Sequence, residues 1–287
     1  MNSWEPSPEQ WADWETRGYF VIRNAIPRDS AIEMRGVIKD LLLRPEPEVK
    51  ADDDPMDPMG DTPQARSARF RKLSNFCTRL PLIWHNFYCS EAMTTVARYF
   101  LGDTLFLKYN SCFVKPARTG SATPWHQDNG LWRDGETEPF NFWMALDPAT
   151  TENGCLQFIP GSHKLGIFPH LLYDDSIHAE LPREEVQKLI ADRGTQQCEL
   201  DSGDVVCWHS SICHYSPPNP SPHGRIAIAG VYSTPQTTRR RKLPKHFLWV
   251  IRNGELCTAF PPEQVDISEI SGPDPFPAAE ETPAPVG

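Results

Sequence analysis

Short segments of strand-like composition, separated by clusters of glycine, proline and asparagine, follow one another along the chain after Gly102. Each is rich in aromatic or β-branched residues and has the length of one strand. Regular strands between such turns are typical of an antiparallel sandwich or barrel. They predict an all-β core with flanking helices, an eight-stranded jelly roll. The segments are residues 104–115, 140–147, 155–160, 204–209 and 225–233.

The first hundred residues predict mainly helices. Ser7, followed by Pro8 and Gln10, has the pattern of a capping box, and Gly18 ends that helix. Ser90 caps a later helix, which Gly102 ends. The elements expected are a strand at 19–26, a helix capped by Asp29 or Ser30 and running through Leu43, helices at 80–89 and 91–101, and one at 183–193 within the strand region.

We predict one domain over residues 1–271, with a helical part at 1–102 and the jelly-roll core at 103–250. Residues 45–67 are rich in proline, aspartate and glycine and predict a loop or mobile flap without a folded element. Residues 272–287 have the composition of a disordered tail.

Composition and charge exclude several functions. A net charge of −10 and a pI of about 5.4 argue against a nucleic-acid partner, because neutralising phosphates needs a basic face. We read the basic cluster at 239–242 as a solvated loop. No apolar run is long enough to span a membrane, and the first residues lack a signal-peptide pattern. The sequence predicts a cytoplasmic protein whose eight cysteines, without a CxxC pair, are buried free thiols.

Trp125-His126-Gln127-Asp128 is a candidate metal-binding motif. Residues two apart in a strand project from the same face, so His126 and Asp128 can reach one metal ion together. A His-x-Asp alone is weak evidence, since one arises by chance in many chains.

A second motif strengthens the first. Residues 203–232 read as two strands joined by a proline-rich turn. If the hairpin centres near Pro220, Ser216 lies opposite Arg225, and His214 lies one step deeper on the same face. A guanidinium fits a carboxylate through two parallel hydrogen bonds. Two histidines and one carboxylate leave three positions open on an octahedral iron, as a chelating 2-oxo acid and dioxygen require.

The sequence resembles the phytanoyl-CoA dioxygenase family over roughly residues 15–233. The shared pattern comprises the HxD of His126 and Asp128, the distant His214, and Arg225 eleven residues after it. A PGSH segment at 160–163 lies between them, and residues 153–164 and 214–219 are also similar to the family.

This resemblance implies a double-stranded β-helix (jelly roll, cupin-like) that binds Fe(2+), 2-oxoglutarate and O2. The implied activity is oxidation, most simply hydroxylation, of a small organic substrate such as a biosynthetic intermediate, with release of succinate and CO2. By position, the resemblance implies metal ligands at His126, Asp128 and His214, contacts to the far carboxylate of 2-oxoglutarate from Ser216 and Arg225, and pocket-lining roles for Tyr109, Trp143 and Gln127.

Asp128 bears on the reaction. Related halogenating enzymes lack a carboxylate at this position to make room for chloride, so the resemblance favours hydroxylation here. Desaturation, ring closure and epoxidation use the same machinery and stay open.

His209 is the alternative third ligand, because it also follows a strand. Its spacing to Arg225 does not match the family, and in a continuous strand it faces away from His214. We expect it to be a packed histidine. His163 is expected to shape the PGSH turn, His223 to lie at a loop tip, and His85 and His178 to be surface or packing residues.

The substrate is expected at a mouth formed by the loops at 45–67, 129–139 and 164–182. These loops carry few basic residues, which does not suit the phosphates of coenzyme A. We expect a small-molecule partner and neither nucleic acid nor membrane; the sequence leaves the oligomeric state open. Two other classes also stay open, a non-catalytic jelly-roll binding protein and a cupin-like metal enzyme that does not use 2-oxoglutarate.

Overall fold

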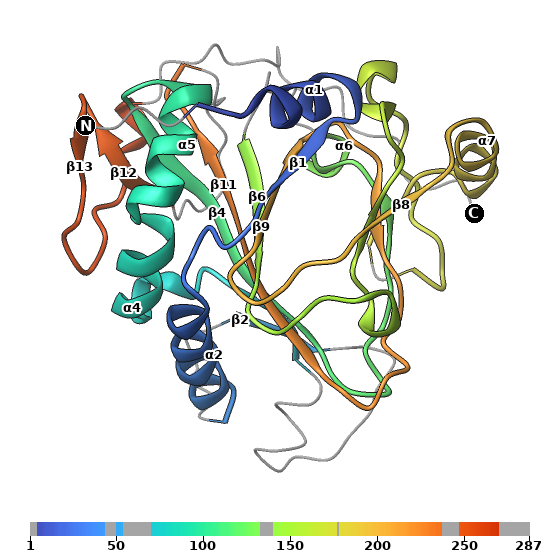
Figure 1. Cartoon of the computed structure of the whole chain (residues 1–287), viewed down its shortest axis with the longest axis horizontal. Coiled ribbons are helices and arrows are strands. Elements are labelled where there is room, and N and C mark those ends of the chain that lie inside the picture. Colours follow the sequence, from blue (N-terminus) through green and yellow to red (C-terminus); the bar gives the residue numbers. More distant parts are fainter. Residues whose placement is uncertain are drawn as a thin grey trace.

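The computed structural model of the protein describes residues 5–43, 50–53, 70–132, 140–176, 178–236 and 247–269. In this part of the chain two β-sheets face each other, and helices cover the outer face of the larger one (Figure 1). The helices are α1 (Pro8–Thr16), α2 (Arg28–Leu43), α4 (Pro81–Ile83), α5 (Glu91–Leu101), α6 (Asp128–Trp132) and α7 (Arg183–Arg193). Shorter turns are η1 (Cys77–Arg79), the π-helical η2 (Trp84–Tyr88), η3 (Thr151–Asn153), η4 (Ser162–Leu165) and η5 (Ile267–Glu269).

Eight strands, β4 to β11, form the predicted jelly-roll core. Four of them run in the order β9-β6-β11-β4 within the larger sheet, and the other four form the smaller sheet in the order β5-β10-β7-β8. Their pairings are antiparallel. The bounds are β4 (Leu105–Lys115), β5 (Thr123–His126), β6 (Phe140–Ala145), β7 (Leu156–Phe158), β8 (Gln196–Cys198), β9 (Val205–His209), β10 (His214–Ser216) and β11 (Arg225–Ser233).

Additional strands extend the larger sheet at its edges. Strand β1 (Tyr19–Ile22) pairs with β9. Strand β12 (Leu248–Arg252) pairs with β4, and β13 (Glu255–Leu256) pairs with β12. Strand β3 (Phe70–Ser74) also pairs with β4, and β2 (Lys50–Asp53) pairs with β3.

Strand β11 shows why the core lies where it does. All nine of its residues are buried, because helices cover one face of the sheet and the second sheet covers the other. Ile226 and Ile228 pack toward the helices, whereas Ala227 and Ala229 face the space between the sheets. Small residues on the inner face leave room there, and Ala229 lines the main cavity.

The helical layer follows the predicted capping signals. Ser7 and Gln10 form the capping box of α1, and the Ser90 hydroxyl accepts a hydrogen bond from the Met93 backbone N–H at the start of α5. Gly102 ends α5 with a φ of 82°, a conformation that favours glycine. Prediction and structure therefore agree on both helices.

Several element predictions need correction. The strand expected at 19–26 ends at Ile22, and α2 begins at Arg28, so Asp29 lies in its first turn and does not cap it. The helix expected at 80–89 is one short α-turn followed by a π-helix. Residues 45–67 contain β2, which pairs with β3; a short polar strand at a sheet edge has no hydrophobic periodicity that would reveal it. The cluster at 239–242 and the tail at 272–287 lie outside the described residues.

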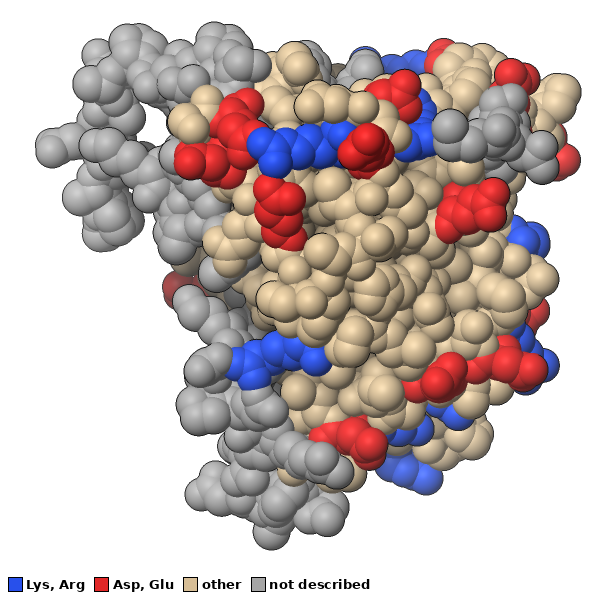
Figure 2. All heavy atoms as spheres, turned by 90° about the vertical axis from the view of Figure 1, so that its left-hand side faces the viewer, with Lys and Arg blue, Asp and Glu red and all other residues tan. Residues whose placement is uncertain are grey.

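The cysteines are free thiols, as predicted, and burial raises the pKa of most of them. Seven are buried, and Cys257 is partly exposed. Among the described helices, none has both the length and the apolar character needed to cross a lipid bilayer. On the face formed by α4, α5, β12 and β13, charged side chains lie mainly around an uncharged centre (Figure 2).

Candidate metal centre and co-substrate pocket

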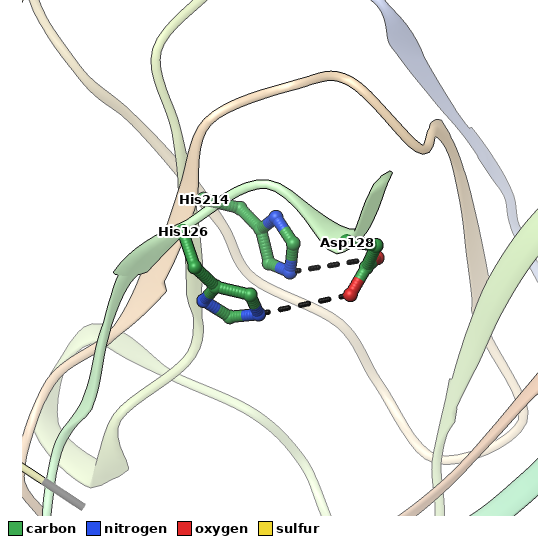
Figure 3. Close-up of side chains that lie close together, drawn as sticks. All are labelled: His126, Asp128 and His214. Carbon is green, nitrogen blue, oxygen red and sulfur yellow. Dashed lines mark ion pairs between the residues drawn. The ribbon is translucent and has the colours of Figure 1, made fainter. Parts of the chain in front are cut away.

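His126, Asp128 and His214 converge at the end of the smaller sheet (Figure 3). His126 ends β5 and lies directly opposite His214, the first residue of β10. One donor atom from each of the three residues lies within 4.8 Å of the others. Asp128 Oδ1 is 3.7 Å from His126 Nε2, and Asp128 Oδ2 is 3.9 Å from His214 Nε2. The structure therefore brings the three residues of the predicted triad together.

Both imidazoles are oriented with Nε2 toward the cluster. His126 Nδ1 lies 2.7 Å from the Pro124 carbonyl oxygen, and His214 Nδ1 lies 3.1 Å from that of Ile212. A carbonyl can only accept, so each Nδ1 carries a hydrogen and Nε2 is the ring nitrogen that can bind a metal ion. Burial, with His214 nearby, also lowers the pKa of His126 well below its usual value. The neutral form that binds metal ions is thus favoured.

Asp128 reaches the cluster differently from the prediction. Strand β5 ends at His126, and Asp128 is the first residue of α6, so the two side chains do not share the face of one strand. Its Oδ2 accepts hydrogen bonds from Asn141 Nδ2 at 2.9 Å and from Trp208 Nε1 at 3.0 Å. Two imidazole nitrogens and one carboxylate are the donor set that non-haem iron(II) oxygenases use, so the residues fit that ion.

A cavity of about 170 Å³ opens beside the cluster, between the two sheets. Aromatic and aliphatic side chains make most of its wall, and charged groups lie at particular points. The predicted residues in its wall are His126, Asp128, His214, Ser216, Arg225, Tyr109 and Trp143.

Arg225 is a buried charge in this wall, with 2% of its surface exposed. Its Nη1 donates a 2.7 Å hydrogen bond to the Gly154 carbonyl, which also accepts one from Ser216 Oγ at 2.8 Å. Its Nε has no hydrogen-bond partner among the described residues, and its Cζ lies 5.0 Å from the centre of the Trp143 ring. Burial lowers the pKa of Arg225 to about 10. A carboxylate in the cavity would supply the missing negative partner.

Lys115 supports the backbone next to Ser216. This residue pairs with Arg225 across β4 and β11, and its ammonium donates to the carbonyls of Ser216 and Pro217, at 3.3 and 2.6 Å. These contacts hold the end of β10 at the cavity wall.

The predicted hairpin between 203 and 232 is not formed. Strand β10 pairs with β5 and β7 in the smaller sheet, whereas β11 pairs with β4 and β6 in the larger one. Ser216 and Arg225 still meet at the cavity because each strand turns its inner face toward the other sheet. The predicted proximity is right, but the pairing behind it is wrong.

Gln127 does not line the cavity. Its side-chain nitrogen donates to the carbonyls of Gly166 and Ser211, and its side-chain oxygen accepts from the Phe168 backbone N–H. These hydrogen bonds connect the loop that contains Gly166 and Phe168 to the loop that contains Ser211.

His209 lies away from the triad. Its ring centre is 5.1 Å from that of Trp14 and 5.2 Å from that of His163, on the side of the sheet covered by α1. The packed-histidine expectation matches this position, whereas the alternative ligand role does not.

Two basic residues in the cavity wall, His178 and Lys72, are among those not identified from the sequence. His178 was expected to be a surface or packing residue, but its ring centre is 5.0 Å from that of His126 and it lines the cavity. Lys72 also lines it, with Nζ 5.3 Å from the centre of the Tyr109 ring. In the sequence, only the position of His178 within the loop 164–182, expected at the cavity mouth, could have indicated its place in the wall. No sequence feature indicated that Lys72 lines the cavity.

Comparison with known proteins relates this arrangement to one family. The family model described as Phytanoyl-CoA dioxygenase (PhyH) matches residues 14–227. L-proline trans-4-hydroxylase of Streptomyces griseoviridis is 28% identical over 174 residues, which are 55% of this chain and 65% of that protein. Phytanoyl-CoA dioxygenase 1 of Oryza sativa subsp. japonica is 31% identical over 147 residues, 48% of this chain and 50% of that protein. The chain thus spans from half to just under two thirds of these two relatives.

Solved structures share the fold. EctD from S. alaskensis, crystallised with 2-oxoglutarate and 5-hydroxyectoine, has a TM-score of 0.66 at 20% identity, covering 91% of this chain and 89% of that chain. The non-heme alpha ketoglutarate dependent carbocyclase SnoK from nogalamycin biosynthesis has a TM-score of 0.62 at 17% identity, covering 87% of each chain. The predicted jelly-roll fold is confirmed.

Proposed function

This chain belongs to the phytanoyl-CoA dioxygenase family, and from that premise we propose that it is an iron(II)- and 2-oxoglutarate-dependent dioxygenase that hydroxylates a small organic substrate. One observation carries the proposal. A single cavity has the His126, Asp128 and His214 donors in its wall together with Arg225, a buried cation without a carboxylate partner among the described residues. A 2-oxo diacid has a 2-oxo acid end that can bind a metal ion held by the three donors, and a far carboxylate that can pair with Arg225.

The residues of the chain have distinct tasks in this proposal. His126, Asp128 and His214 would hold iron(II), and Arg225 with Ser216 would bind the far carboxylate of 2-oxoglutarate. When bound, iron and 2-oxoglutarate supply the oxidising chemistry, with dioxygen consumed and succinate and CO2 released. Trp143 and Tyr109, in the wall, exclude water from the co-substrate.

The substrate we propose is a small molecule. The cavity of about 170 Å³ must hold the co-substrate as well as the reacting part of the substrate. Relatives are named for small molecules, L-proline and ectoine. In the described wall Lys72 and Arg225 are the only lysine or arginine, which does not suit the several phosphates of coenzyme A.

An anaerobic titration tests the proposal. Adding iron(II) and then 2-oxoglutarate to the purified protein should produce the weak visible absorption band of an iron–2-oxo acid chelate. The His126→Ala variant is the control and should not produce it. If the wild type shows neither the band nor calorimetric binding of 2-oxoglutarate after metal loading, the proposal is wrong, and a non-catalytic or 2-oxoglutarate-independent protein is favoured.

A further inference from the structure

The two oxygens of the Asp128 carboxylate have different surroundings. Both of its hydrogen bonds within the described structure fall on Oδ2, from Asn141 Nδ2 and from Trp208 Nε1. Oδ1 accepts no hydrogen bond among the described residues, although both oxygens lie near a histidine, Oδ1 3.7 Å from His126 Nε2 and Oδ2 3.9 Å from His214 Nε2. A carboxylate can bind a metal ion through one oxygen or through both, and this asymmetry bears on which mode occurs.

The donors come from the opposite sheet to the histidines. Asn141 on β6 and Trp208 on β9 are direct cross-strand partners in the larger sheet, so their side chains lie on the same face. Both are buried, Asn141 completely and Trp208 to 95%. His126 and His214, in contrast, belong to the smaller sheet. The pair of donors is therefore a rigid support that reaches across the space between the sheets.

Asp128 needs such a support because the sheet does not fix it. The residue lies beyond the end of β5, in the first turn of the short helix α6. In the jelly-roll core, the side chains that hold its carboxylate in place are Asn141 and Trp208, and neither lies near it in sequence.

We propose that Asn141 and Trp208 are positioning residues that direct Oδ1 of Asp128, and not Oδ2, to the metal. The inference rests on the proposed function. Charge-assisted hydrogen bonds to Oδ2 occupy its lone pairs, and binding through both oxygens would break them. Single-oxygen binding keeps three coordination positions for the 2-oxo acid and dioxygen. Binding through both oxygens would occupy one of these.

Cobalt(II) provides a test that does not depend on turnover. The variants Trp208→Phe and Asn141→Leu each remove one donor while keeping a side chain of similar volume. The matched control is Trp249→Phe, because Trp249 is a buried tryptophan of the same sheet whose Nε1 has no hydrogen-bond partner among the described residues. Cobalt(II) affinity is measured by calorimetry, its coordination by the visible absorption spectrum, and folding by thermal unfolding without metal.

Each donor variant should bind cobalt(II) about 10- to 100-fold more weakly, as is typical when a partner of a metal ligand is lost. Its visible spectrum should change, since the second oxygen is free to reach the ion. The double variant should lose less than the product of the two single losses, because both donors act on one oxygen. Trp249→Phe should keep the wild-type affinity and spectrum.

The outcomes separate the two proposals. If wild-type protein does not bind cobalt(II), the proposed function itself fails. If wild type binds and both donor variants keep its affinity and spectrum, the positioning role is refuted. A weaker affinity with an unchanged spectrum also refutes it, because Asp128 would then bind through the same oxygen without the donors. If one variant does not fold, the other makes the same test.

Discussion

Replacing Arg225 by methionine should weaken 2-oxoglutarate binding while leaving the stability of the metal-free protein nearly unchanged. The guanidinium is buried, and the side chain's hydrogen bond within the described structure goes to a backbone carbonyl, that of Gly154. Burial lowers the pKa of Arg225 to about 10, and a depression of this size corresponds to a cost of about 3 kcal/mol for keeping the charge in the folded state. Below pH 10 the side chain is protonated in both states, so the full cost is present at neutral pH. It is relieved only above pH 10, where the folded protein releases its proton first.

The variant removes this cost together with two favourable contacts. The hydrogen bond to Gly154 contributes about 1 kcal/mol and the contact with the Trp143 ring about 1–2 kcal/mol. Gain and loss therefore nearly cancel in the metal-free protein. The co-substrate carboxylate, in contrast, loses a charge-assisted partner worth about 1.5–3 kcal/mol, or roughly a 10- to 150-fold loss of affinity.

Calorimetric titration of 2-oxoglutarate into manganese-loaded protein measures the affinity, and urea unfolding of the metal-free protein measures the stability. Arg225→Lys should recover part of the affinity, because it restores the charge but not the two-pronged geometry. Arg35→Met is the control, since Arg35 pairs with Asp147 at 2.7 Å and does not line the cavity. Unchanged affinity in Arg225→Met, or a stability loss above about 3 kcal/mol with affinity retained, would refute the reasoning.

Two further predictions concern histidines. His214→Ala should abolish metal binding and succinate formation, whereas His209→Ala, which changes a residue packed against Trp14, should keep both; metal content and succinate yield of the purified variants decide this, and the reverse result would overturn the ligand assignment. Burial lowers the pKa of His163 to about 4 from its usual 6.5, so the unfolded state takes up a proton first as the pH falls, and stability is lost between about pH 6.5 and 4. His163→Asn should reduce the stability lost between pH 7 and pH 5 by about 1 kcal/mol, after allowance for the partial exposure of His163 to water. The measurement is the urea midpoint at each pH, and the same pH dependence in variant and wild type would contradict the prediction. His223→Asn, in an exposed loop, is the control.

The sequence was most informative where structure is local. The strand-like composition of β4 and β11 is a local pattern, and both strands lie within a residue of their predicted ends. The spacing of His126 and Asp128 is local as well, so their proximity could be predicted even though a helix, not a strand, holds Asp128.

Contacts between distant segments could not be predicted in the same way. The proline-rich turn after β10 looks like a hairpin, but it carries the chain from one sheet to the other, and a local pattern does not specify strand partners across the barrel. The orientation of Gln127 and the position of His178 depend on how loops far apart in sequence meet. The family resemblance correctly implies that Ser216 and Arg225 lie close together, whereas the hairpin expected from the sequence, which also placed them together, does not form.

The buried thiols have a practical consequence for handling the protein in air. Sulfur oxidation and alkylation require an accessible thiolate, and seven of the eight cysteines are buried. Burial raises the pKa of Cys213, next to His214, to about 11, and that of Cys155, next to Gly154, also to about 11. These two thiols, which are sequence neighbours of residues at the proposed site, are thus protected from oxidation while the chain is folded. When the protein unfolds and the two sheets separate, the same thiols become accessible and reactive. Each unfolding event therefore exposes them to irreversible oxidation.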